Sequence, residues 1–272
     1  MARIGLIAGK GELPAIWARA AGEKGNEVYA FPLVEEADNP LEGIAAKVSY
    51  VNIGALDSLI AQLSRYEIKK VVMIGKVEKT RFFQDLNLDG RMKRLLAGLK
   101  ELNDDAIMLA IVRELAREGI EVIEQSTYLE DLFPEPEVLT SHEPDEELLA
   151  DMRYGFKMAR EIGRLDIGQT VVVKDRTVLA VEAIEGTDAA IQRGGSLGGP
   201  GVVVAKVSKP RQDWRFDIPT VGANTLSNLI AVKARGLVIE AGKTFLLARE
   251  RIIEEADRNG IVIMAMDSNP PE

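Results

Sequence analysis

The sequence has no cysteine and a single histidine, His142, among its 272 residues. The missing thiols exclude disulfides, zinc–thiolate sites, iron–sulfur clusters and cysteine nucleophiles. The lone histidine excludes metal sites built from several histidines, and any serine–histidine pair would have to use that residue. If the protein uses a metal, oxygen ligands are left, which favours Mg²⁺ or Mn²⁺ over zinc.

Long apolar runs are also missing. No stretch reaches the length of a membrane-spanning helix, and the N-terminus lacks the apolar segment of a signal peptide. We therefore expect a cytoplasmic protein, with attachment to a membrane surface left open. The composition, 46% hydrophobic and 28% charged, suits a packed core, and the length suits two domains of ordinary size.

The formal net charge of -9 argues against a general binder of nucleic acid or of anionic membranes. The charge is unevenly spread, because residues 121–152 contain eleven acids and no lysine or arginine. The rest of the chain therefore carries a net charge of +2. The acidity belongs to one segment, and the remainder could hold an anion.

The first half alternates strands and helices, which predicts an α/β fold with a parallel sheet. Strands are expected at 3–8, 27–31, 47–51, 70–74 and 119–123, and helices at 12–22, 56–63, 91–99 and 104–117. An acidic linker with several prolines, 133–146, is predicted between domains at 1–132 and 147–272. The second half is more β-like, with a hairpin about Asp175-Arg176. Further strands are expected there at 201–207 and 261–264, and helical patterns at 148–159, 226–234 and 243–257.

A glycine loop follows the first predicted strand and precedes a helix, where backbone N–H groups can receive a phosphate. Pro14 replaces the third glycine of a dinucleotide fingerprint, and the second strand ends in Pro32 without an acid for a ribose, so nicotinamide binding is disfavoured. The loop after a later strand would face the same crevice. A tight turn without ligand is the alternative. The residues assigned to a nucleotide or sugar-phosphate site are Gly9, Lys10, Gly11, Glu12, Leu13, Gly75 and Lys76.

Asn103, Asp104 and Asp105 open another predicted helix. Asparagine or aspartate at this place is an ordinary N-cap. The alternative is that Asp104 or Asp105 points into the crevice and holds a ribose, an amide or a metal.

The second half holds a denser set of candidates. Thr187 and Asp188 follow a predicted strand, and either could cap a short helix; Asp188 is also a candidate metal ligand. Residues 194–201 contain five glycines in eight positions, which predicts a loop. Such a loop would be a flexible connector or would cradle a phosphate through Gly194 and Gly195. It lacks the Lys-Ser/Thr ending of a P-loop.

A basic cluster comes next, because residues 193–217 carry a net charge of +3. This cluster suits a polyanion such as a diphosphate, although a solvated charged loop would give the same spacing. Asp217, just before a rigid turn that includes Thr220, is placed as a metal ligand or a base. The candidates in this segment are Lys206, Lys209, Arg215, Asp217 and Thr220.

Three of these segments, Ile4–Pro14, Glu185–Asp188 and Lys206–Gly222, resemble the LpxI family of UDP-2,3-diacylglucosamine pyrophosphatases of lipid A biosynthesis. The third segment is the most specific, and the resemblance spans nearly the whole chain. Family members often have a glycine where this sequence has Lys10.

The resemblance implies a Rossmann-like first domain and a second, mixed-sheet α/β domain particular to the family, with the lipid-bearing nucleotide between them. It implies metal-dependent hydrolysis of the pyrophosphate to UMP and 2,3-diacylglucosamine 1-phosphate, with water attacking the phosphorus on the sugar side. The acid that matches Asp217 is essential in the family. Lys206 and Lys209 would then bind phosphate. Asp217 would hold Mg²⁺ or Mn²⁺ or orient the water, and Asp188 is the second candidate for a metal ligand.

The implied partner is a lipid-linked UDP-sugar, with no nucleic acid. A homodimer and peripheral contact with the inner face of the inner membrane are further expectations. Two acyl chains need an apolar groove, which we expect in the second half. The alternatives are a binding protein without turnover and an NAD-linked oxidoreductase. Calcineurin-like phosphoesterases need several histidines, and the glutamate-rich Nudix motif is missing from the sequence.

Overall fold

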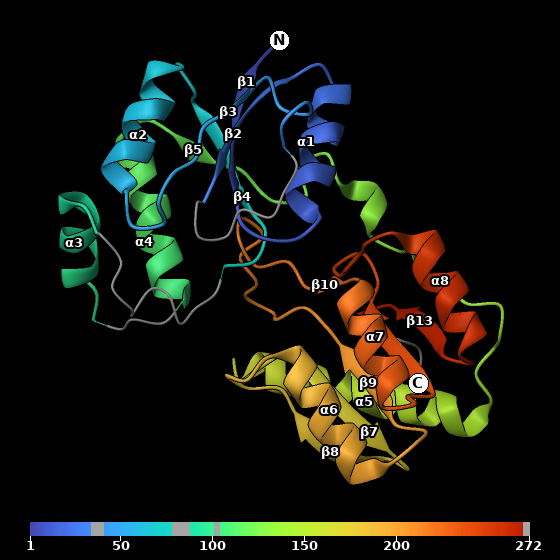
Figure 1. Cartoon of the computed structure of the whole chain (residues 1–272). Helices are drawn as coiled ribbons and strands as arrows, with labels where there is room; N and C mark the ends of the chain where they lie inside the picture. The colour runs from blue at the N-terminus through green and yellow to red at the C-terminus, as the bar shows by residue number, and fades with distance from the viewer. Residues whose placement is uncertain (34–40, 78–87, 101–103, 269–272) are drawn as a thin grey trace. The chain divides into compact units, whose positions relative to one another are not determined.

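The computed structural model describes residues 1–33, 41–77, 88–100 and 104–268 of the chain. These residues form two compact units, each with its own large β-sheet (Figure 1). Unit 1 comprises Met1–Leu129 together with the short segment Trp214–Phe216. Unit 2 comprises Glu130–Asp213 and Asp217–Glu272.

The sheet of unit 1 has five strands, all parallel, in the order β3-β2-β1-β4-β5. The strands are β1 (Arg3–Ala8), β2 (Glu27–Pro32), β3 (Lys47–Val48), β4 (Lys70–Ile74) and β5 (Glu121–Val122). Short apolar runs that are buried on both faces form β1 and β4, as a covered parallel sheet requires. The chain winds outward in both directions from β1 and β4, and doubly wound sheets bind ligands at such a switch point.

Helices cover both faces of this sheet, with α1 on one side and α2 and α4 on the other (Figure 1). The bounds are α1 (Leu13–Glu23), α2 (Leu56–Arg65), α3 (Gly90–Ala97) and α4 (Asp104–Arg117). Leu56, Leu59 and Leu63 recur at helical spacing along α2 and are buried in one core cluster with residues of the sheet. The short helix α3 packs beside α2 and α4.

The sheet of unit 2 has six strands in the order β6-β13-β11-β9-β7-β8. Its middle strands β13, β11 and β9 are parallel, and the pairs β13–β6, β9–β7 and β7–β8 are antiparallel. The bounds are β6 (Glu137–Val138), β7 (Thr170–Lys174), β8 (Thr177–Val181), β9 (Val203–Lys206), β11 (Gly236–Glu240) and β13 (Val262–Met266). Two short parallel strands form a separate pair, β10 (Thr220–Val221) and β12 (Phe245–Leu246).

Helices cover both faces of the unit 2 sheet as well. The long helix α5 packs on one face, and α6, α7 and α8 pack on the other. The bounds are α5 (Glu146–Arg164), α6 (Thr187–Gly198), α7 (Ala223–Ala231) and α8 (Arg249–Arg258), with a 3₁₀ turn at Glu130–Leu132. Along β7, Val171 and Val173 face the α5 side while Val172 faces the other, so each face has its own apolar core.

The predicted fold class is confirmed: unit 1 has a parallel sheet and unit 2 a mixed one. The hairpin about Asp175-Arg176 is also confirmed, since both residues have left-handed φ values, 48° and 54°. Asp151 of α5 accepts hydrogen bonds from both of their backbone N–H groups, at 2.9 and 2.7 Å. The prediction missed β11, because its apolar run has only three residues, Leu237–Ile239, between Gly236 and Glu240.

Candidate functional site

The loops after β1 and β4 meet at the switch point of the unit 1 sheet. The Gly9 N–H donates to the last carbonyl of β4 at 2.9 Å, and Lys10 and Lys76 exchange backbone hydrogen bonds of 2.8 and 2.9 Å. Glycine is required on both sides of this contact. A Cβ on Gly9 would lie 2.6 Å from the Lys76 oxygen, and Gly75 has a φ of +105°. The structure therefore brings the two predicted glycine segments together through their backbones.

The first turn of α1 follows this contact. Gly11, with a φ of +95°, leads to Glu12 at the N-cap position and to Leu13, the first helical residue. The first N–H groups of a helix have no partner within it, so this turn is the part of the loop that suits an anion. Of the acids predicted near α4, Asp105 is exposed in the first turn, whereas Asn103 and the side chain of Asp104 lie outside the described residues.

In unit 2, two charged residues are buried at the carboxyl edge of the sheet. Lys206 ends β9 and is 7% exposed, and Glu240 ends the neighbouring β11 and is 2% exposed. The Lys206 Nζ donates to the Thr220 carbonyl at 2.8 Å. Charged side chains are seldom buried without partners, and buried charged side chains are concentrated at functional sites. This edge is therefore the strongest candidate in unit 2.

Glu240 holds the edge together. Its carboxylate accepts hydrogen bonds from the Ser208 N–H at 2.8 Å, from Lys243 Nζ at 2.9 Å and from the Ser268 hydroxyl at 2.8 Å. Ser208 follows β9 and Ser268 follows β13, so one side chain connects the ends of three parallel strands. It thereby fixes the backbone just beyond Lys206.

Asp217 lies on the loop between β9 and β10, half-buried. The Gln212 side-chain amide donates to both the carboxylate and the backbone oxygen of Asp217. The Gln212 Oε1 in turn accepts the Lys209 N–H at 2.8 Å, while Lys209 Nζ lies 2.7 Å from an oxygen of Asp166. The structure therefore joins Lys209 and Asp217 through Gln212.

A second acid, Glu182, connects the start of α6 to the same edge. Its backbone N–H donates to Thr170, the residue paired with Lys206, at 2.8 Å. The Glu182 carboxylate accepts a hydrogen bond from the Thr187 hydroxyl at 2.9 Å, and Glu182 as a residue is only 8% exposed. Asp188 comes next, half-buried in the first turn of α6.

The predicted glycine loop at 194–201 is wrong, because α6 continues to Gly198. Gly194 and Gly195 are buried, and a Cβ on them would lie 2.5 Å from Val172 and 2.4 Å from Val232. These glycines allow α6 to pack closely against the sheet and its neighbour, so they do not cradle a phosphate.

The other two candidates belong to different units. Arg215 belongs to the Trp214–Phe216 segment, which is part of unit 1. Thr220 opens β10 in unit 2, where its hydroxyl donates to the Ile218 carbonyl at 3.1 Å. The predicted basic cluster is therefore divided between two units.

The acids of the site limit the metal it could take. In the part of the chain that the structure describes, no group of three or more acidic or histidine side chains could hold an ion. Mg²⁺ is commonly bound through one or two carboxylates together with substrate phosphates and water. Asp217 and Asp188 each supply a half-buried carboxylate, the ligand type that such an ion takes. They do not fit a structural zinc site.

Sequence reasoning missed Glu240, Glu182 and Gln212. An acid at the end of an apolar run was the available signal for Glu240, because it marks a carboxyl end within a sheet. Gln212 lies inside the segment Lys206–Gly222 but carries no charge, so the search for cations and acids passed over it.

A sequence model of the LpxI N-terminal domain matches residues 3–132, and one of the LpxI C-terminal domain matches residues 135–264. The UDP-2,3-diacylglucosamine pyrophosphatase LpxI of Caulobacter vibrioides is 32% identical over 280 residues, with 98% of both chains covered.

Solved structures are much less similar. A precorrin-6A reductase has a TM-score of 0.36 and 13% identity, covering 100% of this chain and 90% of that one. The biotin carboxylase domain of a single-chain bacterial carboxylase has a TM-score of 0.28 and 13% identity, covering 63% of this chain and 36% of that one. Neither likeness carries an argument about function. Among the described helices, none combines the length and the apolar composition that a membrane crossing needs.

Proposed function

Because the chain belongs to the LpxI family, we propose that it hydrolyses UDP-2,3-diacylglucosamine to UMP and 2,3-diacylglucosamine 1-phosphate. One molecule of water is added across the P–O–P bond. The observation that carries the proposal is the match of both family domains together with a relative of this activity that is similar over 98% of the chain.

The carboxyl edge of the unit 2 sheet supports this chemistry. Lys206 and Lys209 supply positive charge for a diphosphate, whose oxygens gain charge as the bond breaks. Gln212 holds the Asp217 carboxylate in one orientation. We infer that Asp217, with Asp188 as second ligand, would hold Mg²⁺ or Mn²⁺ against the substrate's phosphates. The ion would neutralise their charge when bound.

The test is UMP release from UDP-2,3-diacylglucosamine by the purified protein with Mg²⁺. Replacing Asp217 by asparagine keeps the size of the side chain and removes its charge. We expect Asp217→Asn to bind the substrate and to lower kcat by at least about a hundredfold, because the charge stabilisation that a bound divalent ion supplies is worth several kcal/mol. Asp175→Asn, in the hairpin turn outside the site, is the matched control and should leave the rate unchanged.

Two outcomes would contradict the proposal. Substrate binding by the wild-type protein without UMP release above a no-enzyme control would favour a binding protein without turnover. Full activity of Asp217→Asn would remove Asp217 from the mechanism. In ¹⁸O-water, attack on the sugar-side phosphorus would place the label in 2,3-diacylglucosamine 1-phosphate and none in UMP.

A substrate with two acyl chains resides in a membrane, so we also propose that the protein works in the cytoplasm as a peripheral protein at the inner membrane face. Cosedimentation with vesicles of anionic phospholipid tests this contact. The homodimer is a prediction from the family resemblance, and light scattering of the purified protein tests it.

A further inference from the structure

Unit 1 contains an apolar pocket of about 110 Å³ on the side of its sheet that α2 and α4 cover (Figure 1). Its wall includes Ile7 and Met73 from the strands, Leu59 from α2, Met92 from α3 and Met108 from α4. None of the described residues that line the pocket is charged. It therefore offers no counter-charge to a diphosphate, and its chemistry suits a hydrocarbon.

The pocket lies at the switch point of the sheet, because Gly9 and Gly75 also line it. The polar side chains in its wall are few. Gln125 is one of them, and its amide donates to the Met73 carbonyl at 2.7 Å. An apolar cavity beside the crevice where this class of sheet binds ligands matches a ligand that is part polar and part hydrocarbon.

We propose that this pocket binds one acyl chain of the substrate, and that Met92 limits the length of the chain that it accepts. The inference rests on the proposed function, because only that function supplies a ligand with acyl chains. It places a hydrocarbon site in unit 1, whereas the sequence predicted an apolar groove in the second half.

Met92 forms the part of the wall that α3 contributes. It is 2% exposed and is the one buried residue of that eight-residue helix. Leu95 and Leu96 of α3 are half-buried and pack against the same core cluster. The position of Met92 is therefore set by this apolar packing together with polar contacts at the start of α3.

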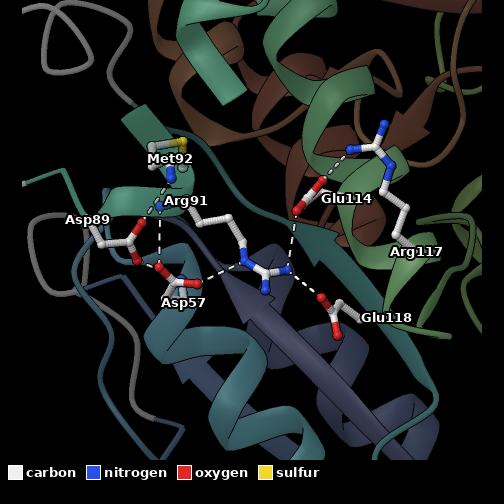
Figure 2. Close-up of polar contacts among 7 residues, drawn as sticks. All are labelled: Asp57, Asp89, Arg91, Met92, Glu114, Arg117 and Glu118. Carbon is white, nitrogen blue, oxygen red and sulfur yellow. Dashed lines mark hydrogen bonds and ion pairs between the residues drawn. The ribbon is translucent and has the colours of Figure 1, made fainter. Parts of the chain in front are cut away.

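Arg91 supplies those contacts from the position next to Met92 (Figure 2). Its guanidinium lies 2.8 Å from Asp57 of α2, and 3.2 and 2.5 Å from Glu114 and Glu118 at the end of α4. These carboxylates, Glu118 first and Asp57 next, raise the pKa of Arg91 above its ordinary value. One side chain therefore ties α3 to both neighbouring helices.

Asp89 completes the attachment at the start of α3 (Figure 2). Its carboxylate accepts the Met92 N–H at 2.8 Å as an N-cap and the Asp57 N–H, from α2, at 2.5 Å. With Arg91 it ties the start of α3 to α2 and α4 by polar contacts. Arg91 is thus a positioning residue, which acts on the acyl chain of the substrate through Met92.

The experiment measures, by calorimetry, the affinities of 2,3-diacylglucosamine 1-phosphate homologues whose acyl chains differ by two carbons. Each buried methylene changes affinity by roughly fourfold. Met92→Ala makes room for about two more methylenes, so we expect the preference for the longer chain to rise roughly fifteenfold. Met108→Phe keeps the wall apolar and fills the pocket, so it should shift the preference to the shorter chain.

Arg91→Gln tests the positioning role, with Arg117→Gln as the matched control. Arg117 pairs with the same Glu114, at 2.8 Å, but does not contact α3 (Figure 2). The selectivity of the protein is the ratio of its affinities for the two acyl homologues. We expect Arg91→Gln to reduce this selectivity several-fold and Arg117→Gln to leave it unchanged. Thermal unfolding of each variant identifies those that have lost the fold.

The outcomes separate this inference from the proposed function. Binding of the homologues without UMP release by the wild-type protein contradicts the function alone. UMP release with a chain-length preference that neither Met92→Ala nor Met108→Phe alters, in folded protein, overturns the pocket assignment. No binding of any acyl homologue by the wild-type protein overturns it as well.

Discussion

Gly9 shows how a single residue decides the geometry of the switch point. The loops after β1 and β4 approach so closely that their backbones exchange hydrogen bonds. A methyl group on Gly9 would meet backbone atoms at 2.6 and 2.9 Å, and backbone cannot move aside as a flexible side chain can.

We therefore predict that Gly9→Ala lowers the free energy of unfolding by about 2–3 kcal/mol, the scale of overpacking a tight contact. Gly22→Ala is the matched control. Gly22 lies inside α1, and a Cβ there would meet nothing within 4 Å. It should stabilise the protein by up to about 1 kcal/mol, because alanine favours a helix. Urea unfolding of both variants decides the matter, and equal effects would contradict the argument.

At the residue scale, the sequence predicts those residues whose role depends on their immediate neighbours in the chain. The glycines at 9 and 75 could be found because each follows an apolar strand. The contacts of Glu240 and Arg91 could not, since their partners are far away in the sequence: Glu240 accepts a hydrogen bond from Ser208, and Arg91 contacts Asp57 and Glu118. Charge and spacing along the chain contain no record of such pairs.

Among the elements, α6 is where the sequence misleads. Its glycines predict a loop because glycine is costly in a helix interior. The packing of the helix reverses that preference: Gly194 and Gly195 lie against Val172 and Val232, where no larger residue fits. By contrast, the strand at 70–74 and the helix at 104–117 coincide with β4 and α4, because their apolar spacing agrees with their burial.

Helix α5 allows a prediction about pH. Asp145 is its N-cap, and the Leu148 N–H, followed by Arg235, lowers the pKa of Asp145 below its usual value. A carboxyl whose pKa is lower in the folded state stabilises the protein above its unfolded pKa, and that stability is lost as the pH falls through the folded value.

Asp145→Asn retains a side chain that caps helices well but cannot titrate. We expect the thermal midpoint of this variant to fall less than that of the wild type between roughly pH 5 and pH 2. Asp145→Ala, which removes the cap altogether, should have a lower midpoint throughout. Identical acid profiles for the wild type and Asp145→Asn would exclude this contribution of Asp145.

At the scale of the whole molecule, the composition limits the metal. With no cysteine and one exposed histidine, the chain offers mainly carboxylate oxygens. We predict that EDTA abolishes UMP release, that Mg²⁺ or Mn²⁺ restores it, and that zinc restores little. Activity that persists after dialysis against EDTA would contradict the metal proposal.

Replacing Asp188 by asparagine weakens one of the proposed ligands. The Mg²⁺ concentration needed for half of the maximal rate should therefore be higher for Asp188→Asn than for the wild type.

The segment Trp214–Phe216 limits how the protein can be divided into fragments. It comes from the second half of the sequence, yet it belongs to unit 1, where the Trp214 carbonyl accepts the Gln125 N–H at 2.8 Å and Phe216 lines the apolar pocket. A fragment that stops at residue 132 would lack that side of the pocket, and the exposed hydrocarbon wall would favour aggregation. The two family domains therefore cannot be exchanged between homologues as whole segments. A chimaera should take residues 214–216 from the same homologue as the first domain.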